Sequence, residues 1–119
     1  MNHPAPTQAA IGEAAQRLRR DGYCVLHDLL PRAQVEALDA ELAGDFAATP
    51  FCEGKFYGER TRRFGRLLAR SQHTAALVTH PVVLGAVRRV LEPGADHVQL
   101  NLTQAIAIHP GELAQMPHR

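Results

Sequence analysis

The segment from about residue 97 to residue 109 alternates between large apolar side chains and polar or small ones. The even positions are nearly all apolar: Val98, Leu100, Leu102, Gln104, Ile106 and Ile108. A period of two predicts a β-strand with its even face on a core and its odd face toward solvent or a cavity. A lone strand cannot pair its own backbone groups or bury its own face, so this segment requires partner strands.

Helical spacing dominates the sequence that precedes this strand. Apolar residues recur every three or four positions over residues 7–20, 31–47 and 81–91, which predicts three amphipathic helices. Thr7 is expected to cap the first helix and Gly22 to end it. Residues 23–27 form a short run of strand-forming residues, and residues 65–79 are expected to hold two short helical segments.

Residues 48–64 fit neither period and are predicted to form a long loop, a kind of segment that is usually functional or disordered. The loop is rich in arginine, and Arg60, Arg62 and Arg63, together with Lys55, are candidates for binding an anionic substrate such as a phosphate or a carboxylate. The alternative is an ordinary solvated charged face. A second alternative makes the chain a small non-enzymatic module whose arginine loop binds an anionic partner.

The order of elements predicts an α+β fold in a single domain over residues 1–119, with residues 1–6 as a flexible leader. The 23–27 segment is too short to be the only partner of the late strand. The remaining strands are therefore expected after Arg119 or in a second copy of the chain. An open sheet edge would also favour self-association.

Composition excludes several classes of protein. A net charge of +1 argues against nucleic-acid binding. No apolar stretch approaches the roughly 20 residues that span a membrane, and the N-terminus has no signal-peptide pattern. The two cysteines, Cys24 and Cys52, form no CxxC pair, which favours a reduced compartment. We expect a cytoplasmic protein.

Two stretches resemble the phytanoyl-CoA dioxygenase family, and the resemblance extends from about residue 8 to residue 119. They are the opening GYCVLHDLLP at residues 22–31 and the late QLNLTQAIAIHPG at residues 99–111, followed by QMPHR at residues 115–119. The resemblance implies a double-stranded β-helix, or jelly roll, of which this chain holds the first strands. It also implies hydroxylation of a small organic substrate with Fe(II) and 2-oxoglutarate. In that family two histidines and a carboxylate hold the iron, a set diagnostic of non-haem Fe(II) oxygenases.

The resemblance carries over to few residues of this sequence. His118 corresponds to the first iron ligand, against the alternative of an exposed histidine near the chain end. Asn101 and Thr103, on the odd face of the late strand, are candidates for contacting 2-oxoglutarate or substrate. The alternative is that both are plain solvent-facing residues. The carboxylate ligand is expected at the position after Arg119, and the second histidine and a 2-oxoglutarate-binding arginine further on. We therefore expect this chain alone to hold no cofactor and to be inactive.

Overall fold

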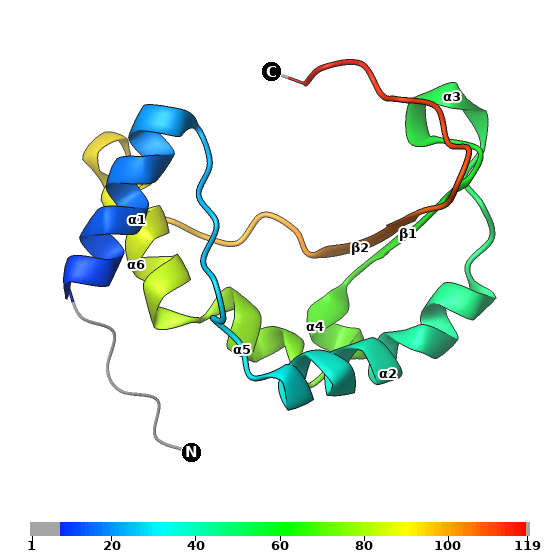
Figure 1. Ribbon diagram of the computed structural model, residues 1–119, viewed down its shortest axis with the longest axis horizontal. Helices are drawn as coiled ribbons and strands as arrows, with labels where there is room; N and C mark the ends of the chain where they lie inside the picture. Colours follow the sequence, from blue (N-terminus) through cyan, green and yellow to red (C-terminus); the bar gives the residue numbers. More distant parts are fainter. Residues whose placement is uncertain (1–7, 119) are drawn as a thin grey trace. The chain divides into compact units, whose positions relative to one another are not determined.

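The computed structural model describes residues 8–118, which divide into two compact units. The first unit joins residues up to 32 with residues 73–101, and the second joins residues 33–72 with those from 102 onward. The elements in chain order are α1 (Gln8–Asp21), α2 (Arg32–Ala48), α3 (Gly54–Tyr57), β1 (Thr61–Gly65), α4 (Leu67–Arg70), α5 (Thr74–Val78), α6 (Pro81–Leu91), the 3₁₀ turn η1 (Glu92–Gly94) and β2 (Gln104–Ile108) (Figure 1). No helix in the part of the chain so described is long and apolar enough to cross a membrane.

In the first unit, α1 and α6 lie side by side (Figure 1). The face that α1 buries consists of Ile11, Ala14 and Ala15, as its spacing predicts. Gly85 of α6 permits the close approach, because a Cβ built there would lie 2.7 Å from Cδ1 of Ile11. The helix pair is therefore held by small residues on facing surfaces.

The ends of these helices follow their sequence signals. Gly22 adopts a positive φ of 81°, and its backbone N–H donates to the Leu18 carbonyl at 3.0 Å, which ends α1 as predicted. Pro81 begins α6, and the His80 ring accepts from the Val82 N–H at 3.3 Å. The predicted cap at Thr7 and the 1–6 leader lie outside the residues that the structure describes.

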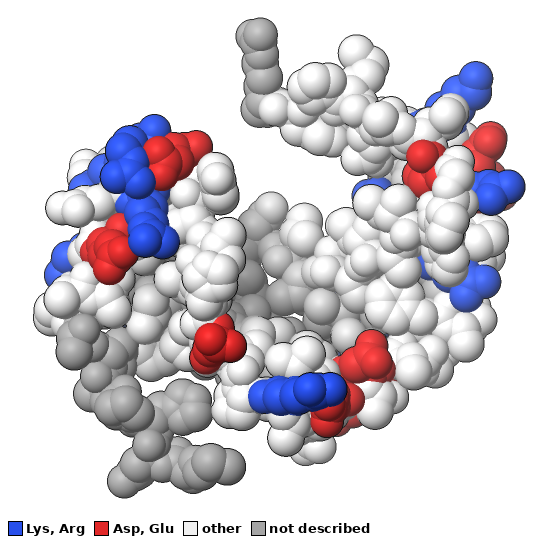
Figure 2. All heavy atoms as spheres, in the orientation of Figure 1, with Lys and Arg blue, Asp and Glu red and all other residues white. Residues whose placement is uncertain are grey.

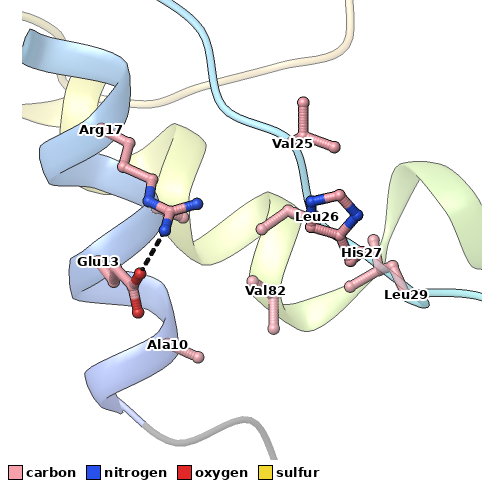
Figure 3. Close-up of a pocket in the computed structure, with 9 residues that line it drawn as sticks. Ala10, Glu13, Arg17, Val25, Leu26, His27, Leu29 and Val82 are labelled. Carbon is pink, nitrogen blue, oxygen red and sulfur yellow. Dashed lines mark ion pairs between the residues drawn. The ribbon is translucent and has the colours of Figure 1, made fainter. Parts of the chain in front are cut away.

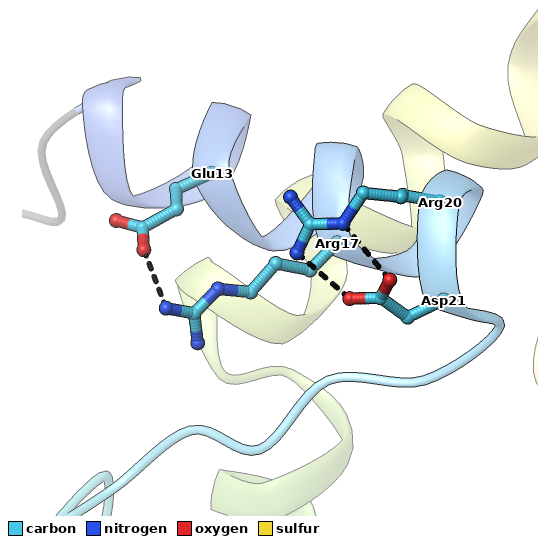
Figure 4. A network of polar contacts seen from close by, with 4 residues as sticks. All are labelled: Glu13, Arg17, Arg20 and Asp21. Atoms are coloured by element: carbon cyan, nitrogen blue, oxygen red, sulfur yellow. Dashed lines mark hydrogen bonds and ion pairs between the residues drawn. The ribbon is translucent and has the colours of Figure 1, made fainter.

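Four charged side chains of α1 form two ion pairs (Figure 4). Arg17 contacts Glu13 at 2.9 Å, and Arg20 forms two bonds of 2.8 Å with Asp21. The Arg20 guanidinium lowers the pKa of Asp21, and the carboxylate in turn raises the pKa of Arg20. Blue and red atoms consequently lie intermixed over α1 in Figure 2. The fifth charged side chain, Arg19, donates to the Arg89 carbonyl of α6.

In the second unit, β1 and β2 form an antiparallel two-stranded sheet that packs on α2. The register places Phe64 opposite Ala105 and Arg63 opposite Ile106. The core of the unit joins both strands to α2 and α4: Leu42, Phe64 and Ala105 are buried, with Leu38, Phe46 and Leu67 packed around them. The rings of Phe46 and Phe64 meet edge to face with centroids 4.8 Å apart.

The late strand differs from its prediction in length, partner and orientation. It covers only residues 104–108, and its partner is β1, inside the segment predicted to be a loop. Ala105 on the odd face is buried, whereas Ile106 and Ile108 on the even face are 47% and 69% exposed. Small side chains let α2 approach the sheet closely, so the odd face packs on the helix. The apolar even face is left open.

Two further predictions meet different outcomes. Residues 23–27, predicted as a short strand, form none, because no segment within residues 8–118 pairs with their backbone. The α+β class is confirmed, since helices pack on an antiparallel sheet. The described residues contain two strands, so the jelly roll stays a prediction.

Candidate functional site

The segment after β2 carries the predicted iron ligand, and the Glu112 carboxylate fixes its start. One oxygen, Oε2, accepts from the Arg60 backbone N–H at 2.6 Å and from the Thr61 hydroxyl at 2.8 Å. The other, Oε1, accepts from the Leu113 N–H at 3.0 Å. The Thr61 hydroxyl, followed by these backbone donors and the Arg60 charge, lowers the pKa of Glu112. Glu112 thus joins the turn after β2 to the beginning of β1.

A glycine makes room for this carboxylate. Gly58 is buried, has a positive φ of 95°, and ends α3 by donating its N–H to the Gly54 carbonyl at 3.1 Å. A Cβ at this position would lie 2.6 Å from Oε2 of Glu112. Any other residue would therefore be strained and would displace the carboxylate.

The chain beyond Glu112 lies against α3. The Gln115 side-chain amide donates to the Phe56 carbonyl at 3.1 Å, and its oxygen lies 3.3 Å from Nε2 of the His118 ring. Gln115 therefore connects α3 to His118, which is itself exposed. A groove of about 420 Å³ runs along this segment, lined by Lys55, Phe56 and residues 113–118.

The donors around His118 do not fit a complete iron site. Within residues 8–118, no group of three histidine, cysteine, aspartate or glutamate side chains converges as metal ligands would. His118 supplies one imidazole. The side chain that forms a hydrogen bond with it is the amide of Gln115. A facial triad needs two further ligands.

The two predicted cofactor contacts belong to different units. Thr103 is half-buried, and its hydroxyl accepts from the Leu67 N–H at 3.0 Å, so it satisfies the first turn of α4. Asn101 is exposed and belongs to the first unit. The structure thus gives Thr103 a local structural bond, and a role for either residue toward 2-oxoglutarate stays a prediction.

The three predicted substrate arginines each contact the protein itself. The side chains of Arg60, Arg62 and Arg63 donate to the carbonyls of Pro110, Phe46 and Tyr57, at 3.0, 3.0 and 3.3 Å. The guanidinium of Arg62 also lies over the Phe51 ring, 4.8 Å from its centroid, and that of Arg63 over Tyr57 at 5.3 Å. These arginines hold β1 to its neighbours. Anion binding through their remaining N–H groups stays a prediction.

Sequence reasoning missed the role of Gln115. It gives no signal of its own, because Phe56, which its amide contacts, lies 59 residues away in the sequence. Lys55 was predicted together with the loop arginines as a possible anion-binding residue, and it is the single lysine of the chain, whose other basic residues are all arginine.

A second hollow, of about 300 Å³, lies in the first unit between α1, α6 and residues 25–29 (Figure 3). Its wall is largely apolar, with Val25, Leu26, Leu29 and Val82 around it. Its one arginine, Arg17, is the one paired with Glu13. The hollow therefore presents a neutral ion pair to any ligand.

The comparisons with known proteins identify the family. The model of the phytanoyl-CoA dioxygenase family matches residues 18–119, which include the segment with His118. The chain belongs to that family. It is 27% identical over 129 aligned residues to the protein named Dioxygenase FrzG from Cladobotryum sp.. The alignment covers 96% of this chain but only 42% of that relative. No solved structure matches the chain.

Proposed function

We propose that this chain is the N-terminal part of an Fe(II)- and 2-oxoglutarate-dependent dioxygenase that hydroxylates a small organic substrate. The observation that carries the proposal is the family match over residues 18–119, supported by the similarity to a dioxygenase. In this proposal His118 is the first iron ligand. When bound, Fe(II) with 2-oxoglutarate supplies the oxidising chemistry, as cofactors generally do.

The residues of this chain position that ligand. Gln115 holds the His118 ring beside α3 through its bond to the Phe56 carbonyl. Glu112 and Gly58 fix the start of the same segment on β1. Support of this kind sets the orientation of a metal-binding imidazole. We propose that the second histidine, the carboxylate and an arginine for 2-oxoglutarate come from sequence that the longer relative has and this chain does not span.

We therefore propose that the 119-residue chain is inactive by itself. We also propose that the longer protein, of which it is a part, is cytoplasmic. The alternative of a non-enzymatic module is less favoured. The arginine loop on which it depends is bonded to three backbone carbonyls.

The test is turnover of 2-oxoglutarate to succinate. We expect none from the 119-residue chain, and turnover from a version that continues through the coding sequence after Arg119. His118→Ala in that longer version should abolish turnover, whereas His97→Ala, an exposed histidine of the first unit, should not. Succinate formed by the 119-residue chain would contradict the proposed inactivity. Turnover that survives His118→Ala would contradict the assigned ligand.

A further inference from the structure

Lys55 stands where two grooves of the second unit meet. The larger groove, of about 420 Å³, follows residues 113–118, and a smaller one of about 190 Å³ follows the turn after β2. Both are lined by Lys55 of α3 and by Leu113. Cavities of a few hundred Å³ are the size that small ligands occupy.

The larger groove combines an apolar wall with positive charge. Phe56, Leu113 and Met116 line it and are 75%, 67% and 84% exposed. Lys55 and His118 are its only titratable side chains among the residues described, and no carboxylate lines it. An ammonium beside exposed apolar surface favours a ligand with an apolar body and a negative charge.

The charges nearby leave Lys55 as the cation best placed to bind a ligand. Arg60, in the smaller groove, already donates to the Pro110 carbonyl, and Glu112 accepts three hydrogen bonds. Glu59 also lines the smaller groove, and neither it nor Glu112 lines the larger one. The hollow of the first unit differs, because Glu13 neutralises its arginine (Figure 3).

We propose that the larger groove binds an aliphatic monocarboxylate, with its carboxylate on Lys55 and its chain along Phe56, Leu113 and Met116. The single lysine supplies one positive charge, which matches one carboxylate better than a doubly charged phosphate. Because His118 lines the same groove, this ligand is the substrate class of the enzyme. That last step rests on the proposed function, but binding of the monocarboxylate to this chain does not.

The single lysine makes the test selective. Reductive methylation with ¹³C-formaldehyde labels only the Lys55 amine and the N-terminal amine, and it keeps their charges. The two signals separate by their pH titration, since an α-amine titrates roughly 2–3 pH units below a lysine. Hexanoate is added to the labelled chain, with hexan-1-ol and 2-oxoglutarate as matched probes. We expect a saturable shift of the Lys55 signal with hexanoate at millimolar concentrations and none with hexanol or 2-oxoglutarate.

A charge-reversal variant tests the location. Met116→Glu places a carboxylate in the groove at an exposed position, so folding is not at risk. We expect hexanoate binding to weaken at least about fivefold, the equivalent of roughly 1 kcal/mol of charge repulsion. Leu91→Glu, at an exposed position of α6, is the control and should bind as the parent does.

The proposal is overturned by no saturable shift with hexanoate, by an equal shift with hexanol, or by equal binding of hexanoate to Met116→Glu and the parent. A shift with 2-oxoglutarate and none with hexanoate would overturn it too. Succinate formation by the longer protein is a separate measurement. Hexanoate binding without turnover would therefore support the groove proposal and contradict the oxygenase proposal. Turnover without hexanoate binding would support the oxygenase proposal and contradict the groove proposal.

Discussion

Each of the two units is stabilised internally by a different kind of contact. In the first, α1 and α6 pack small and apolar residues together, with Gly85 against Ile11, and Arg19 and Arg89 add bonds between the same two helices. In the second, arginine side chains and the Glu112 carboxylate connect strands, turns and helices that lie 16 to 52 residues apart. Helix pairing thus depends on a periodicity that is visible in the sequence. The sheet depends on core packing and polar bonds between elements that are separate in the sequence, and four predictions test that contrast.

The largest effect is expected at the centre of the second unit. Phe64→Ala removes the ring that contacts Phe46 and lies under the Arg70 guanidinium, and should lower the free energy of unfolding by about 3–5 kcal/mol. Hydrogen exchange followed by NMR should show β1 and β2 amides losing protection while those of α1 keep theirs. Phe56→Ala, at a 75% exposed ring, is the control. Equal loss of amide protection in both units would contradict this difference between them.

The next effect is expected at the helix contact of the first unit. Gly85→Leu forces a side chain into Ile11 and should cost about 1–3 kcal/mol, measured by urea unfolding. Gly44→Ala is the matched change in α2, where nothing lies within 4 Å of an added Cβ. It should stabilise the protein by about 0.5–1 kcal/mol, because alanine favours helix more than glycine does. A stabilising Gly85→Leu would show that the helices are not closely packed there.

Acid should weaken the second unit through Glu112. Its pKa is lowered in the folded state, so its contribution to stability is present above the ordinary carboxyl value of 4.5. That contribution is lost as the pH falls from about 4.5 through the lowered pKa that Glu112 has in the folded state. Thr61→Val removes the main hydrogen-bond donor, and should reduce the pH dependence of the urea midpoint in this window. An unchanged or steeper dependence in Thr61→Val would exclude Glu112 as its source.

The smallest effect on stability is expected at the sheet edge. Within the described chain β2 pairs only with β1, so its other edge is open beside the exposed Ile106. We propose that the chain self-associates through this edge, which carries no charge from residue 104 to residue 108. Ile106→Lys should shift the molecular mass measured by light scattering toward the monomer, with stability changed by no more than about 0.5 kcal/mol. Leu91→Lys in α6 should not, and equal association in both variants would exclude the edge.

The helices could be predicted from the sequence because each one carries its own signals. The 7–20, 31–47 and 81–91 predictions match α1, α2 and α6 within one residue at each end. Gly22 and Pro81 mark boundaries by backbone geometry alone. These signals are local, so one sequence suffices to read them.

The sheet could not be predicted in the same way. β1 reads TRRFG, and all but its last residue lie in the 48–64 segment, whose lack of a period predicted a loop. In the structure its two arginines donate to the carbonyls of Phe46 and Tyr57, which lie outside the strand. The alternation in β2 was found, but which of its faces meets α2 depends on the register with β1. Of the candidate site, the sequence indicated His118 and Lys55 separately. The role of Gln115, and the place of Lys55 in the same groove as His118, emerge only once α3 lies beside residues 113–118.

Binding of Fe(II) tests the central claim most directly. Anaerobic calorimetry with 2-oxoglutarate present would compare three proteins: the 119-residue chain, the version that continues past Arg119, and that longer version with His118→Ala. We predict stoichiometric binding by the longer protein, and loss of that binding in the His118→Ala variant. We predict no comparable binding by the 119-residue chain. Binding by the longer protein that does not depend on His118, or no binding at all, would rule out His118 as the iron ligand.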